Sequence, residues 1–326
     1  MSRPHRLDFH GAIHLVQVRG NEGFNIYFDA TALTRPSVER WRSAPHVLRF
    51  LSLLDVCCLE CGAQLFGYCV EPNDAALVMR TPGAPLEAFM QRLGGRYSRY
   101  LHSTAVLPKR VCAFAARYES KVVALEYLPH AVRRVHARPL RVGLARRAID
   151  YPFSSAPAYM GERAPVHLET DAVWLALERK GVFGLRGYRD FMEKAETPYV
   201  AALFEHGSPL DARVVGGSVF VARARDAAGH WPAPVTRQQL LAGVAQLLGA
   251  EPEGLFSAGR QAVLARALVA WYALRSGTAS VREVGTWFDV SAATLGKAIR
   301  HHRHASPRLF EKTLPGIEST DREVED

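Results

Sequence analysis

The fold of the N-terminal part is most clearly indicated by the segment Gln64-Leu-Phe-Gly-Tyr-Cys-Val-Glu-Pro-Asn-Asp-Ala-Ala-Leu-Val-Met79. Its two apolar runs, 64–70 and 75–79, have the length and composition of short strands. The Glu-Pro-Asn-Asp cluster between them is typical of a turn, because proline and asparagine favour the backbone angles that turns require. The sequence therefore predicts two consecutive strands joined by a turn.

The segments on either side of this pair predict a regular alternation. An alternating strand precedes it, and the helical segments show apolar spacing. The order strand, helix, strand, strand, helix, strand predicts an α+β fold for residues 1–150, a ferredoxin-like sandwich with an antiparallel sheet. The flanking strands are expected at 12–18 and within 113–123, and the helices at 37–58, 86–102 and 124–137.

Three further parts follow in the chain. Residues 151–235 are expected to form a mixed helical extension that ends in a linker rich in proline and glycine. Residues 236–305 show helical periodicity throughout and predict an all-α helix-turn-helix domain, whose first helix begins at a capping box on Thr236. The acidic segment 306–326 is expected to be disordered.

The positive charge of this 326-residue chain, formally +9, is unevenly distributed. Residues 1–150 contain 21 lysines and arginines against 12 acidic residues, and the remainder holds 20 of each sign. Concentrated positive charge favours a polyanionic partner through phosphate contacts and counterion release. A solvated basic surface would have the same composition, so charge alone does not identify nucleic acid.

Five cysteines and the absence of an apolar leader indicate reduced thiols in a cytoplasmic protein. Cys58 and Cys61 have the spacing of half a zinc site, but no second pair follows, so buried thiols are the simpler interpretation. No apolar run reaches the roughly 18 residues that a transmembrane helix requires, and we expect no membrane association.

The segment 280–300 has helix-turn-helix spacing. Ser291 is placed to cap the second helix, and Val290 to fill the turn. Thr294, Lys297 and Arg300 would then face outward, where a recognition helix meets base edges and phosphates of duplex DNA. Four apolar residues would pack the two helices together: Val284, Phe288, Leu295 and Ile299. The stretch 236–302 resembles the C-terminal DNA-binding domain of the bacterial chromosomal replication initiator.

Seven short motifs follow one another along residues 3–160. They are Arg3-Pro4, Gly11-Ala-Ile-His14, Arg19-Gly-Asn21, Tyr68-Cys69, Pro72-Asn73, Gly95-Arg-Tyr97 and Tyr151-Pro-Phe-Ser-Ser155. In order and spacing they resemble the REP-associated tyrosine transposases, which are single-tyrosine HUH transposases. The resemblance implies a partner of single-stranded or hairpin DNA.

The resemblance also places a catalytic site, and this chain departs from it. In that family two histidines bind Mg²⁺ or Mn²⁺, which polarises a DNA phosphate for attack by a tyrosine. Asp74 and Ala76 stand at the histidine positions, and Tyr127 matches the nucleophile. Ala131 replaces the polar residue that assists the metal, and Pro129 is expected to disturb a helix through Tyr127.

We therefore expect no cofactor, and Mg²⁺ or Mn²⁺ only if the protein is active. His14, His130 and Glu71 are the candidates for a rebuilt metal site, but a single histidine is more often structural. Asp74 retains one oxygen donor for a hard cation, whereas Ala76 offers none.

DNA contacts make fewer geometric demands than catalysis, and arginines for them remain. Tyr97 and Tyr100, beside two of these arginines, could stack on bases. The expected contacts are Arg19, Arg96, Arg99, Arg117, Arg133 and Arg134.

The sequence favours a DNA-binding protein of the tyrosine transposase family in which strand cleavage is absent or severely impaired. One alternative is an active, metal-dependent transposase that forms a phosphotyrosine at Tyr127. Another is a transcriptional or replication regulator that acts through the helix-turn-helix alone.

Overall fold

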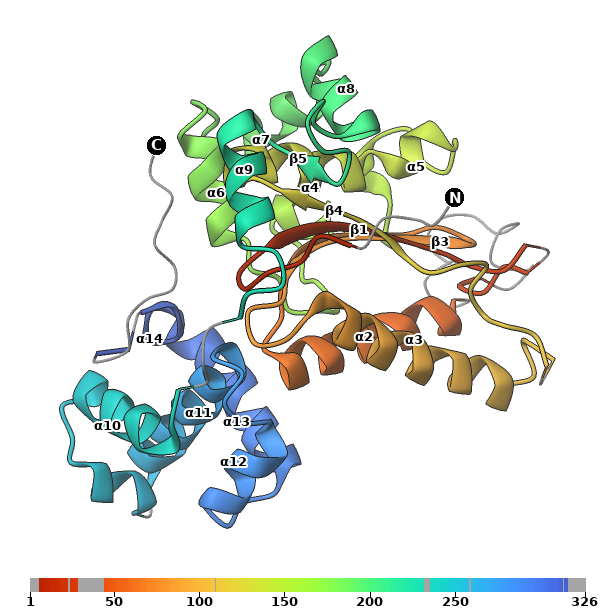
Figure 1. Cartoon of the computed structure of the whole chain (residues 1–326). Helices are drawn as coiled ribbons and strands as arrows, with labels where there is room; N and C mark the ends of the chain where they lie inside the picture. The colour runs from red at the N-terminus through yellow and green to blue at the C-terminus, as the bar shows by residue number, and fades with distance from the viewer. Residues whose placement is uncertain are drawn as a thin grey trace. The chain divides into compact units, whose positions relative to one another are not determined.

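The computed structural model describes residues 6–22, 24–28, 44–108, 110–231, 235–257, 259–312 and 314–315. Its contacts divide the chain into two compact units (Figure 1). The first comprises Met1–Cys57, Gln64–Arg80 and Leu86–Gly229, and the second Cys58–Ala63, Thr81–Pro85 and His230–Asp326. The predicted boundaries at residues 150 and 305 stay predictions.

A five-stranded sheet forms the centre of the first unit, with the strand order β2-β3-β1-β4-β5. The pairs β2/β3, β3/β1 and β1/β4 are antiparallel, and the short fifth strand runs parallel to β4. The strands are β1 Ile13–Arg19, β2 Gln64–Val70, β3 Asp74–Arg80, β4 Glu119–Val123 and β5 Val214–Val215.

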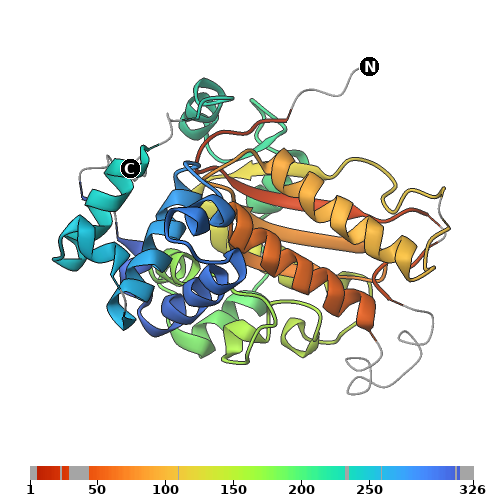
Figure 2. The same ribbon diagram turned by 90° about the horizontal axis from the view of Figure 1, so that it is seen from below.

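Helices cover both faces of this sheet, so the unit is an α+β structure (Figure 1). Helices α2 and α3 lie side by side across one face, as Figure 2 shows for the two orange helices. Helices α4 to α8 lie on the other side of the sheet. Helix α9 packs Val221 and Ala224 in one cluster with Val122 of β4 and Val214 of β5. The bounds are α2 Pro45–Cys61, α3 Leu86–Ser103, α4 Leu128–His136, α5 Arg138–Arg141, α6 Asp171–Glu178, α7 Gly184–Glu193, α8 Pro198–His206 and α9 Ser218–Asp226.

Strand alternation decides which side chains face α4. The register pairs Gln17 with Ala76 and Cys69 with Ala76, so these side chains share one face of the sheet. Gly67, two residues before Cys69, has His136 and Val132 of α4 among its nearest neighbours. The face that carries Asp74 and Ala76 is therefore the face on which α4 packs.

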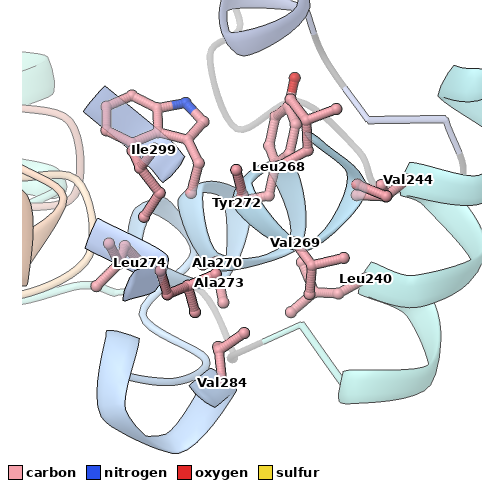
Figure 3. Packing of buried hydrophobic residues seen from close by; sticks show 14 of the residues in the cluster. Leu240, Val244, Leu268, Val269, Ala270, Tyr272, Ala273, Leu274, Val284 and Ile299 are labelled. Carbon is pink, nitrogen blue, oxygen red and sulfur yellow. The ribbon is translucent and has the colours of Figure 1, made fainter. Parts of the chain in front are cut away.

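The secondary-structure elements in the described part of the second unit are all helices. Thr236 and Gln239 form the expected capping box at the start of α10. Helix α11 is apolar nearly all round because it lies at the centre of this unit, and Figure 3 shows its Val269 beside Leu240 of α10. The elements are α10 Arg237–Leu248, the 3₁₀ helix Pro252–Phe256, α11 Arg260–Arg275, α12 Val281–Trp287, α13 Ala292–Ala305 and α14 Pro307–Glu311.

The element order predicted for the N-terminal part is confirmed, but three boundaries differ. The first helix begins at Pro45, and residues 37–43, which were also predicted to be helical, lie outside the described residues. Strand β4 begins only at Glu119, so Arg117 precedes it. A 3₁₀ turn, Leu125–Tyr127, comes before α4, which therefore does not run through Tyr127.

The C-terminal tail differs from the expectation at its start. Residues 307–311 form α14, and Phe310 is buried among the apolar residues of the second unit. Residues 316–326 of the predicted disordered tail lie outside the described part. Among the described helices, none is long and apolar enough to cross a bilayer.

Candidate nucleic-acid interface

The residues at which the resemblance places the metal lie at one end of the sheet. Strand β1 ends where β3 and β4 begin, because both neighbours are antiparallel to β1. The register sets Arg19 opposite Asp74 and Gln17 opposite Ala76. Strand β2 ends at the same place, so Glu71, the residue after it, joins this end. Four strands thus bring distant polar residues together.

The carboxylates of Glu71 and Asp74 are both occupied by side chains of the protein. The guanidinium of Arg138 donates from Nε to Glu71 Oε2 at 2.8 Å, and its Nη2 lies 3.9 Å from Asp74 Oδ1. Gln17 Nε2 donates to Asp74 Oδ1 at 3.2 Å, and Arg19 Nε lies 3.6 Å from the same oxygen. Asp74 and Glu71 are therefore neutralised by two arginines.

A divalent metal does not fit this arrangement. Mg²⁺ and Mn²⁺ require several oxygen or nitrogen donors that converge on one point. Ala76 and Ala131 are buried and offer no donor, and the Glu71 carboxylate already accepts two hydrogen bonds from Arg138. Among the described residues, no three His, Cys, Asp or Glu side chains are grouped closely enough to hold a metal ion.

The two histidines considered for a rebuilt site point elsewhere. His14 alternates with Gln17 along β1, so it lies on the opposite face from Asp74, where its Nε2 is 3.0 Å from Asp8 Oδ1. His130 packs against Phe191 of α7 with 5.3 Å between the ring centroids. Burial, followed by the nearby Lys180, lowers the pKa of His130 to about 4.

Tyr127 is a half-buried residue at the N-cap of α4. Burial, followed by the nearby Tyr199 of α8, raises the pKa of its hydroxyl to about 12. A phenol with a raised pKa forms the attacking phenolate less readily. Pro129 falls in the first turn of α4, where its missing N–H would have no helical partner. As expected, no α-helix runs through Tyr127: α4 begins at Leu128, with Pro129 in its first turn.

Five of the six arginines predicted to contact DNA fall into two groups. Arg19, Arg99 and Arg117 are exposed. Arg133 is only 8 % exposed and lies over the Phe191 ring, and Arg134 forms an ion pair with Glu196. Arg133 and Arg134 thus join α4 to the helical extension, and their guanidinium groups face the protein.

The surface of α3 also differs from the expected stacking platform. Tyr97 is fully buried and donates its hydroxyl hydrogen bond to the Ile26 carbonyl at 2.6 Å, so its ring cannot meet a base. Tyr100 is only partly covered, and its hydroxyl lies 3.0 Å from His46 Nδ1. Arg96 is half-buried and donates to Cys57 Sγ at 3.7 Å. Arg99 and Tyr100 remain accessible on this helix.

Helix α13 presents the predicted row of polar side chains. Ser291 caps it and accepts a hydrogen bond from the Thr294 backbone N–H at 3.1 Å. Thr294, Lys297 and Arg300 recur every third residue and are all exposed. On the opposite side of α13 and on the preceding helix, the four predicted packing residues are buried in one core: Val284, Phe288, Leu295 and Ile299.

The sequence did not identify the ion pair between Glu71 and Arg138. Arg138 was visible only as one member of a basic run, and the two residues are 67 positions apart in the chain. A polar residue directly after an apolar strand, as Glu71 is, was the one local signal. The partner depends on how α5 packs at the sheet end, which no local pattern records.

Comparisons with known proteins give little beyond this geometry. No family model matches the chain, and no curated protein matches it. One solved structure is similar, described as a REP-associated tyrosine transposase bound to a REP hairpin, with 13% identity and a TM-score of 0.37. The similarity covers 52% of this chain and 96% of that one, so it spans about half of the chain described above.

Proposed function

We propose that this chain is a DNA-binding protein derived from the REP-associated tyrosine transposases, and that it has lost strand cleavage wholly or nearly so. Its N-terminal domain has a ferredoxin-like arrangement in this proposal, and α12 and α13 form a helix-turn-helix. The observation that carries the proposal is the exposed row Thr294, Lys297 and Arg300 on α13.

The row on α13 suits a duplex. A helix of this kind enters the major groove, where hydroxyl and cationic side chains reach base edges and phosphates. The apolar side of α13, with Leu295 and Ile299, is held in the core of the second unit. The polar side is thereby presented on a rigid element, with Lys297 and Arg300 supplying positive charge.

The sheet end suits the backbone of single-stranded or hairpin DNA. Arg19 ends β1, and Arg117 comes two residues before β4 begins, so both lie near the same end of the sheet. Exposed guanidinium groups bind phosphate oxygens without the exact placement that catalysis demands. The excess of positive charge in residues 1–150 supports the same partner.

Three features oppose cleavage. Ala76 and Ala131 supply no metal donor, and the carboxylates beside them are bound to arginines. Burial raises the pKa of the Tyr127 hydroxyl to about 12. Without a Lewis acid or a lowered pKa, the tyrosine would be a weak nucleophile.

Binding is tested with the full chain and two double variants. Lys297→Ala/Arg300→Ala is expected to weaken duplex binding, whereas Arg19→Ala/Arg117→Ala is expected to weaken binding of a single-stranded hairpin. Each lost phosphate contact should also reduce the steepness of the salt dependence. Arg186→Ala, which removes an exposed charge from α7, is the control and should change neither affinity.

Cleavage is tested with labelled hairpin DNA and Mn²⁺. We expect no covalent adduct and no nicked product from the parent protein. An adduct that disappears in Tyr127→Phe would establish the active alternative instead. The regulator alternative predicts that only Lys297→Ala/Arg300→Ala affects DNA binding, so an effect of Arg19→Ala/Arg117→Ala excludes it.

A further inference from the structure

We infer that the guanidinium group of Arg138 occupies the position of a divalent metal ion at the end of the sheet, between the carboxylates of Glu71 and Asp74. The positive charge of the guanidinium group offsets the repulsion between these two carboxylates, so no metal ion is required. This step goes beyond the loss of cleavage, because it states what replaced the metal. Only its consequence for DNA rests on the proposed function.

The contact between Arg138 and Glu71 is the first support. The Glu71 side chain is 7% exposed, and Arg138 addresses it through both Nε and Nη2. A carboxylate withdrawn from water to this degree requires a cation or several hydrogen-bond donors. A planar guanidinium satisfies it with two donors in a fixed geometry.

The position of this contact is the second support. Asp74 and Ala76 share their face of the sheet with Gln17 and Arg19, and Arg138 reaches Asp74 on that face at 3.9 Å. The positive group therefore lies beside the residue at which the sequence resemblance places a metal ligand. A divalent ion brought to the same oxygens would meet Arg138 and Arg19 at short range, and like charges repel.

The inference predicts that removing the guanidinium exposes a site for a cation. In Arg138→Met the side chain keeps most of its length but loses its charge. We expect Mn²⁺ to bind this variant at least about tenfold more tightly than the parent protein, because one of the two repelling guanidinium groups is removed and the Glu71 carboxylate is released. Manganese electron paramagnetic resonance measures the bound fraction, and calorimetry measures the affinity.

Two further variants make the result specific. Arg138→Met/Glu71→Gln should lose the gained Mn²⁺ affinity, because it removes the carboxylate that the first substitution releases. Arg147→Met is the matched control: Arg147 pairs with Asp150 at 2.7 Å on the exposed surface, and its loss should leave Mn²⁺ binding unchanged. Thermal unfolding with and without Mn²⁺ shows whether the ion restores stability to Arg138→Met alone.

Two results would overturn the inference. One is site-specific Mn²⁺ binding by the parent protein, and the other is an Arg138→Met protein whose Mn²⁺ affinity and melting temperature in Mn²⁺ match those of the parent. If Arg138→Met does not fold, Arg138→Gln provides the same comparison with a shorter neutral side chain.

The consequence for DNA is measured separately. Hairpin DNA should bind the parent protein equally well in EDTA and in Mn²⁺, and an affinity that EDTA weakens would contradict metal-free binding. A hairpin that binds in neither buffer would contradict the proposed function, whereas the Mn²⁺ comparison between parent and Arg138→Met would still decide the role of Arg138.

Discussion

The hydroxyl of Tyr188 on α7 lies 2.5 Å from Nδ1 of His136 on α4, and both side chains are buried. The other ring nitrogen of His136 is 2.6 Å from Ser155 Oγ, which in turn accepts from the Tyr68 backbone N–H at 2.8 Å. A continuous chain of polar groups therefore runs from the helical extension to β2. The extension belongs to the core of the first unit.

Replacing Tyr188 with phenylalanine should destabilise the first unit. The substitution leaves the buried Nδ1 of His136 without its partner, which costs about 1–3 kcal/mol in the free energy of unfolding. Urea denaturation measures the change. Tyr199→Phe is the control, because Tyr199 is 60% exposed and loss of its hydroxyl removes a group that is largely in water. Equal stability of Tyr188→Phe and the parent would show that the hydrogen bond contributes nothing.

The protein should lose stability as the pH falls from about 6.5 toward 4. Burial lowers the pKa of His136 to about 3, and burial with Lys180 lowers that of His130 to about 4, whereas both approach 6.5 in the unfolded chain. In this window the unfolded state binds protons that the folded state excludes, so acid favours unfolding. The full stability is present above pH 6.5.

His130→Phe isolates one part of this acid sensitivity. His130 Nδ1 is buried without a hydrogen-bond partner among the described residues, so a phenyl ring can replace it beside Phe191. The pH slope of unfolding should shrink by up to about one proton, and by less if solvent screens the site. His206→Phe, at a 78% exposed side chain, should leave the slope unchanged. Parallel slopes for His130→Phe and the parent would refute the assignment.

Lys121 fastens α8 to the sheet. Its Nζ donates to the carbonyl oxygens of Phe204 and Glu205 at 2.7 and 2.8 Å, in the last turn of α8, where unpaired carbonyls attract a cation. In Lys121→Met these bonds are lost, and the amides of α8 should exchange with deuterium faster than in the parent. Lys180→Met, at an exposed position, is the control. Unchanged exchange in α8 would assign its attachment to Arg134 instead, which donates to the Ala201 carbonyl of α8 at 3.3 Å.

Local sequence patterns predicted the helices and strands better than they predicted the tertiary contacts between them. The strand pair around Glu71 and the Ser291 cap follow from turn and capping chemistry within a few residues, and both are present. The helix expected at 124–137 begins only at Leu128, because Pro129 is excluded from a helix interior and suits a helix start. The burial of Arg133 depends on how the extension packs, which residues near it in sequence do not encode.

Replacing Gly285 with alanine has two opposing effects on the stability of the second unit, one from backbone entropy and one from a steric clash. In most helices Gly→Ala is stabilising by about 0.5–1 kcal/mol, because alanine loses less backbone entropy. At Gly285, however, a Cβ would lie 2.5 Å from the Val290 carbonyl oxygen, and Val290 N–H donates to the Gly285 carbonyl at 2.9 Å. The turn between α12 and α13 passes too close to this position for a methyl group.

We therefore expect Gly285→Ala to destabilise the second unit by about 1–3 kcal/mol, as overpacking against backbone does. Because the clash displaces the turn that sets the position of α13, duplex DNA binding should weaken as well. Gly254→Ala is the matched control, since nothing lies within 4 Å of its added Cβ. Denaturant unfolding of the two variants measures the change in stability, and titration with duplex DNA measures the change in affinity. If Gly285→Ala were more stable than the parent, the backbone of this turn would have to yield, and a rigid presentation of Lys297 and Arg300 would be wrong.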